Sequence, residues 1–94
     1  QHTFIDVTVT IGRDVTLYPG TILQGDTTIG EGSEIGPNTR LSDCVVGSGS
    51  IVQNTVGRES EIGTDAVVGP FASLPPGSSV SNGQHTGAFY TGQP

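Results

Sequence analysis

The sequence predicts an all-β fold in which short parallel strands wind into about five triangular coils, a parallel β-helix. Three observations predict it: a six-residue period of aliphatic side chains, a small or β-branched residue at the fifth place of each six, and 15 glycines among 94 residues. A period of six fits neither an α-helix nor one long strand. It does fit short strands joined by tight corners, repeated along the chain.

The aliphatic position is the strongest of these signals. Counted in sixes from residue 5, it holds seven branched aliphatics in succession: Ile5, Ile11, Leu17, Leu23, Ile29, Ile35 and Leu41. A second register holds Val46 and Val52, and a third holds Val56, Ile62, Val68, Leu74 and Val80. With aliphatics at about a quarter of positions, seven successive hits have odds of roughly one in ten thousand. The two register changes, near 43–46 and 54–56, indicate altered corners.

The fifth place of each six indicates what fills the interior. It holds Val9, Val15, Thr21, Thr27, Ser33, Thr39, Ser50, Ser60, Ala66, Ala72 and Ser78. Alternate residues of a strand share one face, so the fifth-place residue and the aliphatic both point inward. Three strands with their corners, at six residues each, would close one triangular coil of about 18 residues. Successive coils would then stack through parallel strand pairing. We therefore expect Ile11 to stack on Ile29, Leu17 on Ile35 and Leu23 on Leu41.

The chain divides into two parts. Residues 1–80 carry the repeat and are predicted to form the β-helix. Residues 81–94 are rich in Gly, Ser, Pro and Asn, the repeat decays there, and we interpret them as a C-terminal cap or tail. Such a segment would cover the open sheet edge that otherwise invites aggregation.

Composition excludes several functions. The formal net charge is −6, lysine is absent, and the only cations besides histidine are Arg13, Arg40 and Arg58. This balance argues against nucleic acid or an anionic membrane as partner, and against coenzyme A binding to this segment alone. The single cysteine, Cys44, is interpreted as structural. Without an apolar run of about 18 residues or a visible signal peptide, the cytoplasm is the expected compartment.

Several hexads resemble the hexapeptide acyltransferase superfamily: those beginning Ile-Gly at residues 11–16, 29–34, 35–40 and 62–67. The stretches 4–15, Tyr18-Pro-Gly-Thr, Ile35-Gly-Pro-Asn-Thr and 68–77 are similar to a narrower family over roughly residues 3–90. That family is the bifunctional N-acetylglucosamine-1-phosphate uridyltransferase / glucosamine-1-phosphate acetyltransferases, which make UDP-N-acetylglucosamine for bacterial cell walls. The matching part is the early coils of their C-terminal domain.

The resemblance carries its own expectations. It implies a left-handed β-helix, a homotrimer and a separate N-terminal nucleotidyltransferase domain. Acetyl-CoA and Mg are implied only for the full-length family, so no cofactor is expected in this segment. The family's functional residues do not carry over. Its Leu-Arg-Pro-Gly motif reads Leu74-Pro75-Pro76-Gly77 here, and Gln93 stands where the family has Lys. We therefore assign no catalytic, cofactor-binding or metal-binding residue.

Other candidate sites are weak. A zinc site needs three or four ligands, and this fold's γ-carbonic-anhydrase-like site needs three His, whereas only His2 and His85 are present. The nine carboxylates are expected in solvated corners, with no cleft for paired acid–base chemistry. An ice-binding array would need repeated Thr-x-Thr pairs, but the pair at Thr8 and Thr10 becomes Asp26 and Thr28 after 18 residues. Strand propensity accounts for the threonines.

Two hypotheses follow. The first is a β-helical scaffold that holds three nucleotidyltransferase domains together, with its acetyltransferase site truncated or lost. The alternative is an acetyl-CoA-dependent acetyltransferase that acts on glucosamine-1-phosphate.

Overall fold

A computed structural model describes residues 3–92, and every regular element within them is a β-strand. The strands form three parallel sheets, which we call A, B and C. Sheet A contains β1 (Phe4–Ile5), β4 (Ile22–Gln24), β7 (Arg40–Ser42), β10 (Thr55–Arg58) and β13 (Ala72–Leu74). Sheet B contains β2 (Thr10–Ile11), β5 (Thr28–Ile29), β8 (Val45–Val46), β11 (Glu61–Ile62) and β14 (Ser79–Val80). Sheet C contains β3 (Thr16–Leu17), β6 (Glu34–Ile35), β9 (Ile51–Val52) and β12 (Val67–Val68).

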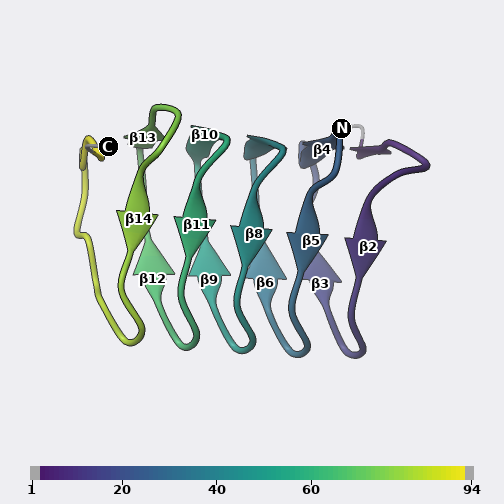
Figure 1. Cartoon of the computed structure of the whole chain (residues 1–94), viewed down its shortest axis with the longest axis horizontal. Coiled ribbons are helices and arrows are strands. Elements are labelled where there is room, and N and C mark those ends of the chain that lie inside the picture. The colour runs from purple at the N-terminus through teal and green to yellow at the C-terminus, as the bar shows by residue number, and fades with distance from the viewer. Residues whose placement is uncertain (1–2, 93–94) are drawn as a thin grey trace.

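The sheets are the three sides of a stack of coils about 28 Å long and 20 Å across (Figure 1). In Figure 1 the chain advances from right to left, the nearer strands of sheet B run downward, and the farther strands of sheet C run upward. This winding is left-handed. The parallel β-helix predicted from the six-residue period is thus confirmed.

The predicted stacking is also confirmed. Ile11 pairs with Ile29, Leu17 with Ile35 and Leu23 with Leu41, one coil apart. The aliphatic residues of the middle coils are fully buried, and Leu23, Ile35, Leu41, Val52 and Val68 have no exposed surface. They form one continuous column, so each coil buries its apolar face only against the coils above and below it.

The small hydroxyl residues at the fifth place donate hydrogen bonds to backbone carbonyls of the corners. Of these residues, Thr21, Thr27, Ser33, Thr39, Ser50, Ser60 and Ser78 are buried. Their hydroxyls donate to nearby carbonyls, as Thr21 Oγ1 does to Tyr18 O at 2.6 Å and Ser50 Oγ to Gly63 O at 2.6 Å. Within residues 3–92 no buried side-chain polar atom lacks a partner. Thr and Ser are therefore small enough for this place and also supply a donor that the corner requires.

One inward assignment was wrong. Val56 was expected in the core, but it is 53% exposed, and Gly57 occupies the inward position between Leu41 and Leu74. The reason is the number of residues in each corner. Three corners are one residue shorter than the others, because Leu41 to Val46, Val52 to Gly57 and Gly57 to Ile62 each span five residues. The sequence indicated two register changes, whereas the structure has three shortened corners. A shift of one residue in a strand turns its side chains to the other face, which is why Val56 points outward.

The corners depend on left-handed backbone. Positive φ recurs at equivalent corner places, in one column at Gly20, Asn38, Asn54, Phe71 and Phe89. Gly36 and Gly69, which follow the inward Ile35 and Val68, also have positive φ, whereas Gly47, which follows Val46, does not and has a different role. A Cβ added to Gly47 would lie 2.7 Å from Thr64 N, so neighbouring coils approach too closely there for any side chain.

The two ends of the stack differ. In the first described coil, Ile5 and Ile11 are 40% and 37% exposed although they lie on the inward side. At the other end, residues 84–92 continue around the prism. His85 bridges Val67, Thr91 bridges Ser73, and the Val67 amide donates to Gln84 O at 2.9 Å. These contacts occupy the free edges of sheets C and A; the domain boundary at residue 80 stays a prediction.

Candidate functional site

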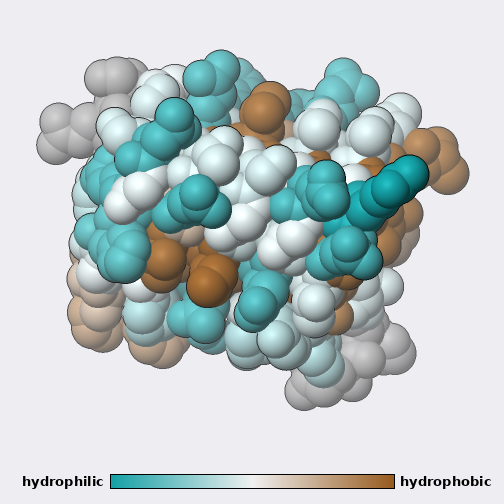
Figure 2. Space-filling view, turned by 90° about the horizontal axis from the view of Figure 1, so that it is seen from below, coloured by the Kyte–Doolittle hydropathy of each residue, from teal (hydrophilic) through white to brown (hydrophobic). Residues whose placement is uncertain are grey.

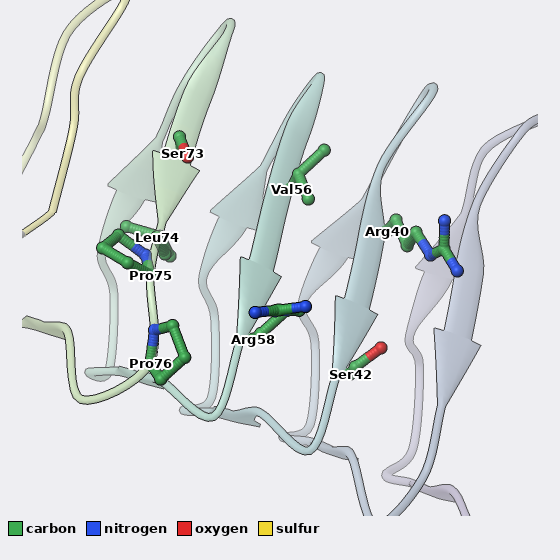
Figure 3. A pocket seen from close by; sticks show the side chains of 8 residues that line it. All are labelled: Arg40, Ser42, Val56, Arg58, Ser73, Leu74, Pro75 and Pro76. Atoms are coloured by element: carbon green, nitrogen blue, oxygen red, sulfur yellow. The ribbon is translucent and has the colours of Figure 1, made fainter.

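A groove of about 500 Å³ lies on the outer face of sheet A (Figure 3). Strands β7, β10 and β13 and the corner after β13 line it with Arg40, Ser42, Val56, Arg58, Ser73, Leu74, Pro75 and Pro76. Its floor is therefore made of outward side chains from three successive coils. We call it the sheet A groove.

The parallel register fixes how the polar side chains are arranged. Arg40 pairs with Val56, and Ser42 pairs with Arg58, so the two arginines lie on adjacent strands but are displaced by two residues along them. Neighbouring strands are about 4.8 Å apart. In Figure 3, Arg58 extends from β10 across the face toward β7, whereas Arg40 turns away from β10.

Gln24 holds Arg40 in this orientation. Arg40 Nε donates to Gln24 Oε1 at 3.1 Å, and Ser42 Oγ donates to the same oxygen at 3.0 Å. Within residues 3–92 no hydrogen bond engages the two terminal guanidinium nitrogens of Arg40. These nitrogens remain available as donors, because a guanidinium carries five N–H groups in a planar fork.

Charge is distributed unevenly around the prism. No carboxylate lines the sheet A groove, although the protein has nine carboxylates and a net charge of −6. A second hollow of about 490 Å³, over sheet B, contains Glu61 and no cation. Figure 2 views the corner between sheets B and C and shows mainly hydrophilic and neutral residues, with small hydrophobic patches. The sheet A groove thus brings cationic and apolar side chains together.

The remaining sequence candidates lie apart from this groove. His85 is exposed at the last turn, and His2 lies outside the described residues. Among residues 3–92 no group of three or more His, Cys, Asp or Glu side chains is placed to hold a metal ion. Eight of the nine carboxylates are exposed and the ninth, Asp6, is half-buried, accepting from Gly25 N at 2.9 Å. The outward column of sheet B reads Thr10, Thr28, Val45, Glu61 and Ser79, which is no threonine array.

Within residues 3–92 two titratable side chains have a shifted pKa, and neither belongs to a cluster of such groups. Burial raises the pKa of the Cys44 thiol, which lies inside the core and touches Ser42 O at 3.4 Å. The charge of Glu34 raises the pKa of Tyr18, whose hydroxyl also donates to Glu34 Oε1 at 3.3 Å. Cys44 is thus structural, as its sequence context indicated.

Sequence reasoning did not assign Arg40 and Arg58 to a common site. They are 18 positions apart, and the six-residue period alone would place them at the same point of successive coils. The shortened corners shift Arg58 by two residues relative to Arg40. The absence of carboxylates from the outward positions of β4, β7, β10 and β13 was the one available signal.

Comparison with known proteins agrees with this fold. Residues 8–43 match the family model described as bacterial transferase hexapeptide (six repeats). This match covers less than half of the chain, and it agrees with the β-helix of six-residue repeats that the coils form. Over most of its length the chain is similar to part of the bifunctional protein GlmU, which confirms the resemblance inferred from the motifs.

Two relatives illustrate the similarity. GlmU of Geobacillus sp. (strain WCH70) is 44% identical over 88 residues, which is 94% of this chain and 19% of the relative. GlmU of Rhodococcus opacus (strain B4) is 53% identical over 87 residues, covering 93% of this chain and 17% of the relative. The chain therefore spans about a fifth of the length of the curated relatives it matches.

Solved structures share the fold at low identity. AntD, an N-acyltransferase from Bacillus cereus, matches with a TM-score of 0.84 at 16% identity, over 95% of this chain and 64% of that chain. A hexapeptide transferase family protein from Anaplasma phagocytophilum matches with a TM-score of 0.59 at 22% identity, over 96% of this chain and 69% of that chain. Within the described residues, no helix is long and apolar enough to cross a membrane.

Proposed function

We propose that this chain is a β-helical scaffold and trimerisation segment of a bifunctional, GlmU-like enzyme of the uridyltransferase type. The similarity to GlmU over 93–94% of the chain supports this parent, and the chain's small share of the relatives leaves room for a nucleotidyltransferase domain. On this proposal the segment itself carries no complete acetyltransferase site.

One observation carries the scaffold role: the repeat is intact while the site positions are not. The column of buried aliphatics runs without interruption from Leu23 to Val80 apart from Gly57. By contrast, Pro75 occupies the groove wall where the resembled family has an arginine, and a proline side chain has no donor for an anion. A chain under selection to fold but not to catalyse retains the buried aliphatic column and loses the arginine of the site motif.

Exposed apolar side chains support assembly. Outward residues of the prism include Phe4, Val45, Val56, Phe71 and Phe89, each 49–77% exposed. Their burial between subunits would contribute about 25 cal/mol for each Å² of apolar surface removed from water. A single copy of this small, one-dimensional stack buries little, so contact with further copies adds stability.

Size-exclusion chromatography with light scattering tests the assembly. The expected particle has three times the 9.6 kDa mass of the chain at micromolar concentration. A stable monomer in that concentration range would contradict the trimer.

The alternative function is an acetyl-CoA-dependent acetyltransferase acting on glucosamine-1-phosphate. Titration calorimetry with acetyl-CoA separates the two proposals. The scaffold proposal expects no saturable heat in the micromolar range, because the chain has no lysine and carries a net charge of −6. Saturable micromolar binding would favour the enzyme.

A further inference from the structure

The carboxylates of this protein are gathered on one side of the prism. All nine are among the described residues, and seven of them stand in the corners at the two edges of sheet B: Asp6, Asp26, Asp43 and Glu59 between sheets A and B, and Asp14, Glu31 and Asp65 between sheets B and C. Glu61 lies on the outer face of sheet B itself, whereas Glu34 lies on sheet C. Eight of the nine carboxylates therefore surround sheet B.

The corner opposite sheet B, which joins sheet C to sheet A, carries no charge. Its successive turns are residues 18–21, 36–39, 53–54, 69–71 and 86–90, and none of these residues is acidic or basic. Two of the turns instead present Phe71 and Phe89, which are 56% and 77% exposed and whose rings stack on each other. On a chain with a net charge of −6, this is the edge at which two copies repel each other least.

The two faces beside this corner carry complementary columns of outward side chains. On sheet A the strands β7, β10 and β13 present Arg40, Val56 and Ser73. On sheet C the strands β6, β9 and β12 present Glu34, Ile51 and Val67. A cation followed by an aliphatic residue thus stands on one face, and a carboxylate followed by aliphatic residues stands on the other.

The columns are also level with each other. Glu34 precedes Arg40 by one side of a coil, which corresponds to about a third of the ~4.8 Å between stacked strands. Both side chains are exposed. Arg40 has no hydrogen bond at its terminal nitrogens within residues 3–92, and Glu34 Oε1 accepts a long bond of 3.3 Å from the Tyr18 hydroxyl. Both groups are therefore available to a partner of opposite charge.

We infer that the corner between sheets C and A is the contact surface between copies of this chain, with sheet A of each copy against sheet C of the next. Arg40 then pairs with Glu34 of the partner subunit, Val56 packs on Ile51 of the partner subunit, and Phe71 and Phe89 lie near the symmetry axis. A contact between two different faces is heterologous, and three copies related by a third of a turn close it into a ring.

This arrangement rests on the proposed trimer and names the surface that forms it. It places the acidic side of every copy outward, so that sheet B and its exposed Val45 face the solvent. The trimer carries three times the net charge of −6, and the carboxylates of different copies are kept apart across the width of the prism.

Charge reversal tests the pair between copies. Sedimentation of the full chain over a range of concentrations measures the midpoint at which half of the chains are assembled. Arg40→Glu and Glu34→Arg each place like charges together, so each should raise this midpoint by about tenfold or more. The double variant restores an opposite-charge pair and should return the midpoint most of the way. A double variant that assembles as poorly as the single variants would overturn the pairing.

Two variants on the acidic side are matched controls. Arg13→Glu and Glu61→Arg change the net charge by the same amounts as Arg40→Glu and Glu34→Arg, but they lie at the corner between sheets B and C and on sheet B. Each should change the midpoint by less than about threefold, because surface charges outside a contact are largely screened. All four side chains are exposed, so the variants should fold, which circular dichroism checks. Equal effects on both sides of the prism would overturn the surface.

A fluorescent probe tests the aromatic part of the corner. The chain has no tryptophan, so Phe89→Trp introduces a single one. Its emission should move to shorter wavelength, and its quenching by acrylamide should fall at least twofold, at concentrations where the chain assembles. Val7→Trp, at a fully exposed position between sheets A and B, should be quenched equally at all concentrations. Equal quenching of the Phe89→Trp probe in monomer and trimer would overturn its place in the contact.

The unmodified protein separates this inference from the proposed function. If it stays monomeric at every concentration, the trimer is overturned and this contact surface with it. If it forms a trimer that Arg40→Glu and Glu34→Arg leave unchanged, the contact surface is overturned while the scaffold proposal stands.

Discussion

At the scale of single residues, the room available at each inward position of the coil determines which size of side chain lies there. The inward places alternate between a large aliphatic and a small hydroxyl or methyl group, as Leu23 and Thr27 do. Gly57 is the exception, and Leu41 fills the space it leaves, because a Cβ on Gly57 would lie 3.2 Å from Leu41 Cδ2. The core is therefore packed residue against residue between coils rather than in one central cluster.

Leu41 provides a direct measure of this packing. It is fully buried between Leu23 and Gly57, so Leu41→Ala should reduce the free energy of unfolding by about 3 kcal/mol through lost burial and a residual cavity. Urea unfolding followed by circular dichroism measures the change. Ile22→Ala, on the outward and half-buried face of β4, is the matched control and should cost less than about 1 kcal/mol. Equal losses at both positions would contradict the inward column.

Cys44 makes stability depend on pH. Burial raises its pKa in the folded state, so the folded protein retains the thiol proton at a pH where the unfolded chain, with a pKa of about 8.5, releases it. The unfolded state then binds fewer protons, and stability falls as pH rises above about 8.5 toward the folded pKa. Urea midpoints at pH 7.5 and 9.5 should show this decline.

The variant Cys44→Ser supplies the control. It has no group that titrates at this place, and it resembles the buried serines at Ser50 and Ser60. Its urea midpoint should change less than that of the parent protein between the same two pH values. A parallel decline in both proteins would assign the effect to another group.

At the scale of elements, the corners rather than the strands carry the conformational cost. A strand here has two to four residues, and each corner from β2 onward turns through a left-handed residue. Gly and Asn accept that conformation readily, whereas Phe71 and Phe89 adopt it at φ of 62° and 60°. Their rings stack with centroids 5.4 Å apart, which offsets part of the cost of these two corners.

Glu59 tests the cost of a single corner. It adopts φ of 46° in a shortened corner, and its side chain is exposed. Glu59→Asn should stabilise the protein by about 0.5 kcal/mol, because asparagine tolerates the left-handed region better than glutamate does. Thermal unfolding measures the gain, and Glu59→Gln, which removes the same charge and keeps the longer side chain, should show less. If Gln and Asn stabilise equally, relief of charge repulsion and not the backbone explains the effect.

At the scale of the whole molecule, the fold is a one-dimensional stack. Each strand contacts the equivalent strand of the coil before and the coil after, and the three sheets run the length of the prism. Stability then depends on how many neighbours a coil has. The end coils, where Ile5 and Ile11 are partly exposed, have the fewest.

Hydrogen exchange should show this gradient. The amides of Gly30, Gly47 and Gly92 donate over the same 2.8 Å to Val46 O, Ile62 O and Ser73 O, so bond length does not distinguish them. Their places in the stack do distinguish them. The amides of Gly30 and Gly47 in the middle coils should exchange about 100-fold more slowly than that of Gly92 in the last turn. Exchange measured by NMR tests this. Uniform protection along the chain would show that the stack unfolds as one unit.

The sequence by itself determined the fold, because inward positions recur every six residues only if short strands alternate with tight corners. It therefore predicted the stacking of Ile11 on Ile29 and the burial of the fifth-place residues. Only the tertiary structure decided that Val56 faces outward and that Arg40 and Arg58 border one groove. The physical reason is that a corner shorter by one residue moves the inward positions after it by one residue along the sequence, and corner lengths become visible only when the coils are stacked.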